Sequence, residues 1–135
     1  MGRQTEEHIL VVEDDSSIAE LLTWILNDAG YSVTWVDSLR EARRYCSKAL
    51  PDVIIADLLL PDGLGSDLVH ELTRTYNGSS PASIVMSAVP QAKQHADAAG
   101  ASLCLTKPFD LTELLESISH LTSSRKLKRF QDESA

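Results

Sequence analysis

"PDVIIADLLLPDGLG", residues 51–65, places a single acid, Asp57, between two aliphatic runs. The run before Asp57 is apolar without alternation, which is typical of a parallel strand buried on both faces. A bare carboxylate beside a hydrophobic core is costly unless a cation or another partner compensates its charge. Asp57 therefore indicates both the end of a central strand and a site that holds positive charge.

Segments with the pattern of strands and helices alternate on both sides of this stretch. The expected strands are "HILVV", "YSVTWV", "DVIIAD", "ASIVMS" and "SLCLT", at residues 8–12, 31–36, 52–57, 82–87 and 102–106. Apolar residues at helical spacing lie between and after them. Ser38 with Glu41, and Asp110 with Glu113, are capping boxes that open two of the helices, and Gly30 and Gly100 end two others.

Five strand–helix units in a row predict an α/β fold with a parallel sheet and right-handed crossovers. We expect a five-stranded sheet in the order 2-1-3-4-5 with helices on both faces, the flavodoxin-like, doubly wound, three-layer arrangement. Residues 8–122 form the expected domain, and residues 1–7 are an N-terminal tail. Periodicity fades in "SSRKLKRFQDESA", residues 123–135, which is interpreted as a C-terminal tail or the start of a linker.

Composition narrows the function classes. A formal net charge of -8 argues against general binding to nucleic acid or anionic membranes and is compatible with binding cations. Cys46 and Cys104 are not closely spaced and are interpreted as buried, reduced thiols. Because no apolar stretch approaches the length of a membrane span and no signal-peptide core is present, we expect a cytoplasmic protein.

The acids of the sequence converge at one edge of the predicted sheet. Ligands of open α/β sheets bind beyond the carboxyl ends of the strands. The residues that follow these ends are Glu13, Asp14, Asp15, Asp57, Ser87 and Lys107. Two like charges about 4 Å apart repel by about 4 kcal/mol at an effective dielectric constant of about 20, so such a cluster gains protons or holds a cation. Oxygen ligands from different strands suit Mg²⁺, although Asp14 and Asp15 could instead cap the first helix.

This arrangement also suits phosphoryl transfer. A carboxylate can act as the nucleophile and form an aspartyl-phosphate. The transition state mainly requires positioning and cations near the phosphoryl oxygens, which Mg²⁺ and Lys107 would provide. Ser87 could donate a hydrogen bond to the product phosphate.

The sequence resembles the receiver domain of two-component response regulators from about His8 to Leu121. The resemblance is carried by four motifs in order: "ILVVEDD", "DVIIADLLLPDGLG", "IVMSA" and "LTKPF". It implies that Asp57 is the phosphoacceptor and that Mg²⁺ is held by Asp14, Asp57 and the backbone carbonyl of Leu59, with Glu13 acting through water. It further implies that Ser87 is the switch hydroxyl, that Lys107 is the family's active-site lysine, and that the Lys107–Pro108 peptide bond is cis.

One position departs from the family. Receiver domains commonly carry Tyr or Phe three residues before the lysine, and this chain has Cys104 there. In the usual account an inward rotation of that ring accompanies the bonding of the switch hydroxyl. Cys104 has no ring to rotate. Phosphorylation could still proceed, but the family's account does not predict how the last strand and its neighbouring helices report it.

The resemblance implies a signalling phosphoacceptor domain, not an enzyme, although it assists its own phosphorylation and dephosphorylation. The expected phosphodonor is a sensor histidine kinase or a histidine phosphotransfer protein, and the receiver of the signal is an output domain or effector protein. A homodimer could form through the face made by the fourth helix, fifth strand and fifth helix. We expect no membrane partner and no direct nucleic-acid binding.

Two other functions have partial support or a clear objection in the sequence. A phosphorylation-independent, receiver-like interaction module is supported by Cys104 alone. A Mg²⁺-dependent phosphohydrolase is disfavoured because such enzymes need a second Asp two residues after the nucleophile, where this chain has Leu59.

Overall fold

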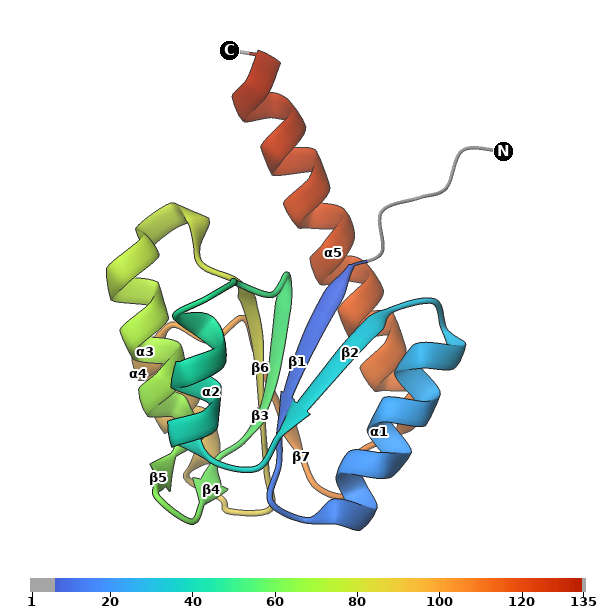
Figure 1. The fold of residues 1–135 in the computed structure, drawn as a ribbon, viewed down its shortest axis with the longest axis vertical. Coiled ribbons are helices and arrows are strands. Elements are labelled where there is room, and N and C mark those ends of the chain that lie inside the picture. Colours follow the sequence, from blue (N-terminus) through green and yellow to red (C-terminus); the bar gives the residue numbers. More distant parts are fainter. Residues whose placement is uncertain (1–6, 135) are drawn as a thin grey trace.

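The central sheet has the predicted topology. The structure, a computed structural model, describes residues 7–134 and the side chains of residues 7–124. Five parallel strands lie in the order β2-β1-β3-β6-β7, which is 2-1-3-4-5 when the strands of this sheet are counted along the chain (Figure 1). These strands are β1 (His8–Val12), β2 (Ser32–Val36), β3 (Val53–Asp57), β6 (Ala82–Ser87) and β7 (Leu103–Thr106).

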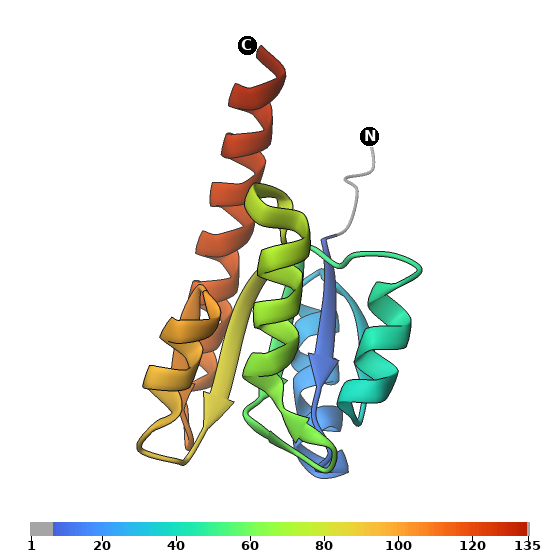
Figure 2. The same cartoon turned by 90° about the vertical axis from the view of Figure 1, so that its left-hand side faces the viewer.

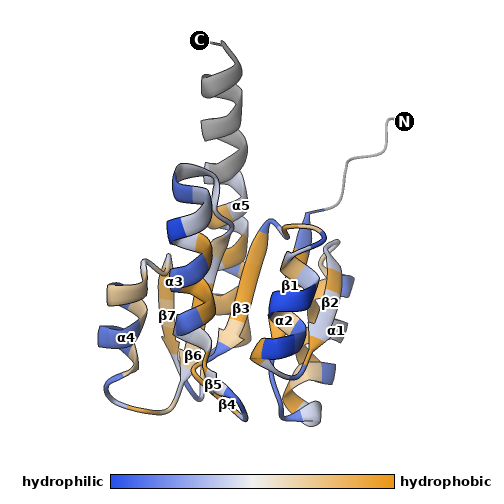
Figure 3. Cartoon of the chain, turned by 60° about the vertical axis from the view of Figure 1, so that its left-hand side comes forward, coloured by the Kyte–Doolittle hydropathy of each residue, from blue (hydrophilic) through white to orange (hydrophobic). Residues whose placement is uncertain are grey.

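Helices cover both faces of the sheet. The helices α1 (Ser16–Asp28) and α5 (Leu111–Ser134) pack on one face, and α2 (Leu39–Cys46), α3 (Gly65–Tyr76) and α4 (Ala92–Ala99) pack on the other. Alternate residues of each central strand face opposite layers: Ile9 and Val11 contact the α1 and α5 side, and Leu10 and Val12 the α2 and α3 side. Figure 3 shows the hydrophobic strands between helices whose outer sides are hydrophilic.

Capping groups explain where the helices begin and end. Asp15 begins α1, because its Oδ1 accepts hydrogen bonds from the backbone N–H groups of Ser17 and Ile18, at 2.9 and 3.2 Å. Ser38 begins α2 by accepting from the N–H of Glu41 at 3.2 Å, and Asp110 accepts from the N–H of Thr112 at 2.7 Å where α5 begins. Gly100 follows α4 with a φ of 88°, a left-handed conformation that favours glycine.

Two features differ from the sequence expectations. A two-stranded antiparallel hairpin, β4 (Leu59–Leu60) and β5 (Gly63–Leu64), follows the third strand of the sheet. Its strands are too short to give a periodic pattern, and only the Pro-Asp-Gly turn between them indicates it. The helix α5 continues to Ser134, through the segment that was expected to be a C-terminal tail or the start of a linker. No glycine or proline interrupts this segment, and therefore nothing local ends the helix.

The hairpin and the far end of α5 lie at opposite ends of the molecule (Figures 1 and 2). The hairpin is at the end where the parallel strands finish, whereas α5 extends past the end where they begin. A short 3₁₀ segment, η1 (Asn77–Ser79), follows α3. Within the described residues, the structure contains no helix of the length and apolar character needed to span a bilayer.

Candidate phosphoacceptor site

Three carboxylates meet at the carboxyl ends of β1 and β3. These strands are direct neighbours, with Val12 paired to Ala56, so the residues that follow them emerge side by side. Glu13 and Asp14 come directly after β1, and Asp57 is the last residue of β3. One carboxylate oxygen from each of the three lies within 4.8 Å of the others. The predicted acidic cluster is therefore present.

Lys107 reaches this cluster from the loop after β7. Its Nζ lies 3.2 Å from Oε1 of Glu13 and 3.3 Å from Oδ2 of Asp57. The side chains are 20% exposed for Lys107, 1% for Glu13 and 14% for Asp57, so these ion pairs are shielded from water. One ammonium group thus bridges the acid of one strand end and the acid of its neighbour.

The pKa shifts follow from burial and from this charge arrangement. Burial raises the pKa of Glu13, and the nearby charge of Asp57 raises it further; a hydrogen bond from the Asp15 N–H and the charge of Lys107 act against them. Burial by itself would lower the pKa of Lys107, but the charges of Asp57 and Glu13 raise it above its ordinary value. The site holds more acids than cations, which is the electrostatic condition for binding a further cation.

The donor set fits Mg²⁺. Carboxylate oxygens from two strand ends are hard ligands, and Mg²⁺ is commonly bound by one or two carboxylates while it keeps several waters. Asp14 is exposed and Asp57 is half-buried, so an ion can reach both. Asp15, the alternative acid, has its carboxylate engaged by the N-terminus of α1. Asp15 rather than Asp14 therefore caps that helix.

The loop after Asp57 is held by backbone hydrogen bonds. The N–H of Leu58 donates to the carbonyl of Met86 at 2.8 Å, and the N–H of Gly65 donates to the carbonyl of Leu58 at 2.7 Å. A Cβ on Gly65 would clash with the carbonyl oxygen of Asp57 and lie 3.1 Å from its carbon. Glycine at position 65 therefore lets α3 begin against the backbone of Asp57. Leu59, whose carbonyl was predicted as a ligand, begins β4 within this loop.

Ser87 lies on β6, the strand next to Asp57, and Cys104 lies on β7, one strand further along the sheet. Ser87 is buried at the end of β6, and its Oγ accepts a hydrogen bond from the N–H of Val89 at 2.9 Å. Cys104 is half-buried and packs with the apolar cluster under α4, and this burial raises the pKa of its thiol. The Lys107–Pro108 peptide bond is cis, as the resemblance implied.

Several side-chain contacts were not predicted, both beside the site and at the opposite end of the sheet. The indole N–H of Trp35 donates to the backbone carbonyl of Glu13 at 2.7 Å, and Asp62 binds the N-terminus of α2. At the opposite end of the sheet, His8 is half-buried in β1. Its Nε2 lies 2.6 Å from the Tyr45 hydroxyl and 3.0 Å from Oγ1 of Thr34. Partners so distant in sequence leave no periodic signal.

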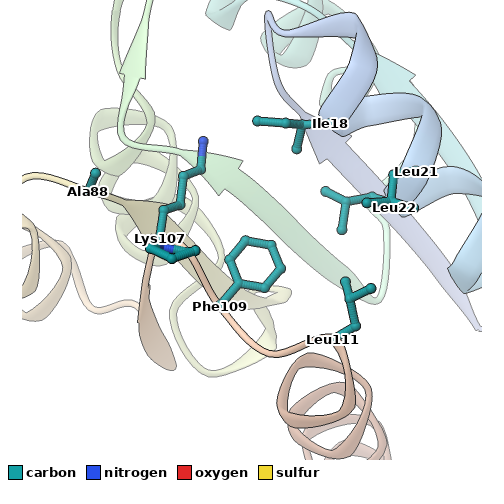
Figure 4. Close-up of a pocket in the computed structure, with 8 residues that line it drawn as sticks. Ile18, Leu21, Leu22, Ala88, Lys107, Phe109 and Leu111 are labelled. Carbon is teal, nitrogen blue, oxygen red and sulfur yellow. The ribbon is translucent and has the colours of Figure 1, made fainter.

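An apolar cavity adjoins Lys107 (Figure 4). It has a volume of about 450 Å³, and its lining residues come from α1, from the ends of β6 and β7, and from the start of α5: Ile18, Leu21, Leu22, Ala88, Lys107, Pro108, Phe109 and Leu111. The ammonium end of Lys107 points away from the ring of Phe109. Leu21 and Trp24 of α1 are 48% and 68% exposed.

Comparisons with known proteins show the family to which the chain is similar. Residues 9–119 match the family model of the response regulator receiver domain. The chain is 30% identical over 112 residues to an uncharacterised 14.6 kDa protein of Leptolyngbya boryana, covering 82% of this chain and 86% of that protein. It is 33% identical over 114 residues to the virulence transcriptional regulatory protein PhoP of Shigella flexneri, covering 84% of this chain and 51% of PhoP. The chain thus spans about half the length of that regulator.

A solved structure shows the same fold. The chemotaxis response regulator CheY4 of Vibrio cholerae superposes with a TM-score of 0.78 at 31% identity, over 87% of this chain and 99% of CheY4.

Proposed function

Because the chain belongs to the response regulator receiver domain family, we propose that it accepts a phosphoryl group on Asp57 in a Mg²⁺-dependent reaction. The donor is a phosphohistidine of a sensor histidine kinase or phosphotransfer protein. The observation that carries this proposal is the bridge from Lys107 to Asp57 and Glu13, within a cluster of three acids that has room for a divalent cation.

The chain's own residues supply most of what the transfer requires. An Asp57 carboxylate oxygen attacks phosphorus, so that a P–O bond forms while the P–N bond to the donor imidazole breaks and its electron pair stays with the imidazole. Lys107 lies 3.3 Å from Asp57 and is placed to neutralise a phosphoryl oxygen. Ser87 is buried on the adjacent strand, and its hydroxyl would leave Val89 to donate to the phosphoryl group.

Receiver domains bind Mg²⁺ at an acidic pocket, and the residues here fit that ion. Asp14, Asp57 and the carbonyl of Leu59 would hold it, with Glu13 acting through water. When bound, Mg²⁺ would neutralise charge that develops on the phosphoryl oxygens. Glu13 would also keep Lys107 in place, because its buried carboxylate lies 3.2 Å from Nζ.

Intact mass spectrometry tests the acceptor. The protein is incubated with acetyl phosphate and Mg²⁺, and we expect wild type to gain the mass of one phosphoryl group. Asp57→Asn should gain none. Asp15→Asn is the matched control: it also removes a carboxylate next to the site, but asparagine still caps α1, so it should be phosphorylated like wild type. A mass gain on Asp57→Asn equal to that of wild type would show that another residue is the acceptor.

The cavity beside Lys107 is the proposed docking place for the phosphodonor. A donor histidine must come within bonding distance of Asp57, and Leu21, which lines the cavity, is exposed on α1, as is Trp24 three residues further along the helix. An amphipathic helix that carries the phosphohistidine would fit such a surface.

Comparing protein and small-molecule donors tests this surface. Leu21→Asp should slow transfer from an autophosphorylated histidine kinase while leaving phosphorylation by acetyl phosphate unchanged. Leu50→Asp changes an exposed leucine that lies outside the cavity and serves as the control. Equal rates of transfer from the kinase to all three proteins would rule out docking at this cavity.

The signal would pass to an effector or output domain through α4, β7 and α5, the face that could also support a homodimer.

Cys104 favours a second candidate, a module that binds partners independently of phosphate, because Cys104 fills the family's aromatic position with a small thiol. Amide NMR shifts separate the two candidates: a phosphorylation switch shifts resonances of α4 and β7 on phosphorylation, whereas a phosphate-independent module does not.

We further propose residues 8–122 as the domain, and the cytoplasm as its location.

A further inference from the structure

Asp62 joins the hairpin after the phosphoacceptor to a helix far away in sequence. It lies in the turn between β4 and β5, and both of its carboxylate oxygens are used. Oδ1 accepts from the N–H of Leu39 and Oδ2 from the N–H of Arg40, each at 2.9 Å. These are the first two residues of α2. The two hydrogen bonds lower the pKa of Asp62, although its side chain is fully exposed.

The residue next to Asp62 contacts the same place on α2. Gly63 has a φ of 146°, and a Cβ there would lie 2.8 Å from Cδ1 of Leu39. Leu39 is buried, and it packs in the same apolar cluster as Leu60 of the hairpin. The tip of the hairpin is therefore held against the first turn of α2 by the Asp62 hydrogen bonds and by packing on Leu39.

The base of the hairpin is held elsewhere. The backbone N–H of Leu58 donates to the carbonyl of Met86 on β6, and the N–H of Gly65, the first residue of α3, donates to the carbonyl of Leu58. Between these anchors and the Asp62 turn lies Leu59, whose side chain is exposed and whose carbonyl is the proposed metal ligand. The base fixes one side of Leu59, and the contacts with α2 fix the other.

We propose that Asp62 is a positioning residue for the metal site: by fastening the β4–β5 hairpin to α2, it fixes the Leu59 carbonyl relative to Asp57. This inference rests on the proposed function, because it assigns Asp62 a part in cation binding at that site. Asp62 itself does not contact the ion. Groups that hold a metal ligand in place typically change metal affinity by about tenfold or more when they are removed.

Two control variants isolate this effect. Ser38→Ala removes a capping hydrogen bond from the same N-terminus of α2, where Ser38 accepts from Glu41 at 3.2 Å, but it leaves the hairpin untouched. Asp67→Asn removes one exposed negative charge from the first turn of α3. Ser38→Ala thus matches the loss of a cap, and Asp67→Asn matches the loss of a charge.

Calorimetric titration with Mg²⁺ alone provides the first measurement. We expect Asp62→Ala to weaken Mg²⁺ binding by about tenfold. Asp62→Asn keeps one acceptor oxygen, so its Mg²⁺ affinity should lie between those of Asp62→Ala and wild type. The Mg²⁺ affinities of both controls should stay within about twofold of wild type. Amide exchange without Mg²⁺ provides the second. In Asp62→Ala the Leu39 and Arg40 amides and those of the hairpin should exchange faster, whereas Ser38→Ala should leave the hairpin amides unchanged.

The outcomes separate the inference from the function on which it rests. If wild type binds Mg²⁺ and Asp62→Ala binds it as tightly as Ser38→Ala does, Asp62 is only a helix cap and the positioning role is wrong. If the hairpin amides are equally protected in Asp62→Ala and wild type, the role is also wrong. If wild type itself binds no Mg²⁺, the proposed function fails and this inference fails with it.

Discussion

Replacing Gly65 with alanine should disrupt the site more than any other single-methyl change in the loop after Asp57. The added Cβ would clash with the carbonyl oxygen of Asp57 and would also lie 3.2 Å from Cβ of Ala56. The first of these neighbours is backbone, so neither a rotamer change nor a small side-chain shift relieves the clash. The start of α3 must move away from the end of β3.

The magnitude follows from two contributions. Forcing a methyl group into a packed position costs about 1–3 kcal/mol. Moving the start of α3 also weakens the 2.7 Å hydrogen bond from Gly65 to Leu58, which contributes about 1 kcal/mol. We therefore expect Gly65→Ala to lower the free energy of unfolding by about 2–4 kcal/mol and to weaken Mg²⁺ binding, because Asp57 and Leu59 flank the displaced backbone.

Urea unfolding and Mg²⁺ titration of the same samples measure both effects. Gly30→Ala is the control: Gly30 has a φ of 103° and nothing within 4 Å of the position a Cβ would take. Its replacement should cost only about 1–2 kcal/mol of backbone strain and leave Mg²⁺ binding intact. If Gly65→Ala is no less stable than Gly30→Ala, or if it binds Mg²⁺ like wild type, the argument from close approach is refuted.

Three further predictions concern single side chains. Lys107→Ala removes a partner of buried Glu13, so the pKa of Glu13, already raised by burial, should rise further. The variant's loss of stability, measured by urea unfolding without Mg²⁺, should be about 1–3 kcal/mol near pH 7.5 and smaller near pH 5, because a lower pH favours the neutral form of Glu13, which does not need the Lys107 charge. An equal loss at both pH values would contradict this. Burial raises the pKa of the Cys46 thiol from 9.0 to about 11, so this thiol ionises in the unfolded chain before it does so in the folded protein as the pH rises. Between about pH 8 and pH 10.5, the free energy of unfolding should therefore fall by about 1–2 kcal/mol more in wild type than in Cys46→Ala. Parallel pH dependence of unfolding in the two proteins would be the contrary result. Ser87→Ala leaves the Val89 N–H without its acceptor and should cost about 1 kcal/mol in urea unfolding; an unchanged midpoint would show that this hydrogen bond contributes nothing.

The sheet and the acid–lysine cluster could be predicted because their signals are local. Each strand is a short aliphatic run, and each functional side chain follows directly at its carboxyl end, as Asp57 follows "VIIA". Once the strand order is known, parallel neighbours bring Glu13, Asp57 and Lys107 to the same edge. The position of the site therefore follows from the pattern of the chain plus one rule of topology.

The missed features depend on contacts between distant residues. Asp62 binds amides 22 and 23 residues earlier, and Trp35 donates to a carbonyl 22 residues away. Neither contact alters the spacing of apolar residues, which is what a sequence pattern reports. Apolar spacing can also mislead: Leu50 continues the helical spacing of Leu39 and Cys46, but α2 ends at Cys46 and Leu50 is exposed.

The length of α5 bears on how a small movement at the site would be carried outward. The helix begins four residues after Lys107 and runs for 24 residues, or about 36 Å at 1.5 Å per residue. A continuous helix is stiff along its axis, so a tilt of its first turn, close to Lys107, would also move its far end. A tilt of about 5° in its first turn would move the opposite end through about 3 Å, which exceeds the helix shifts of about 1–2 Å that accompany switching transitions at interfaces.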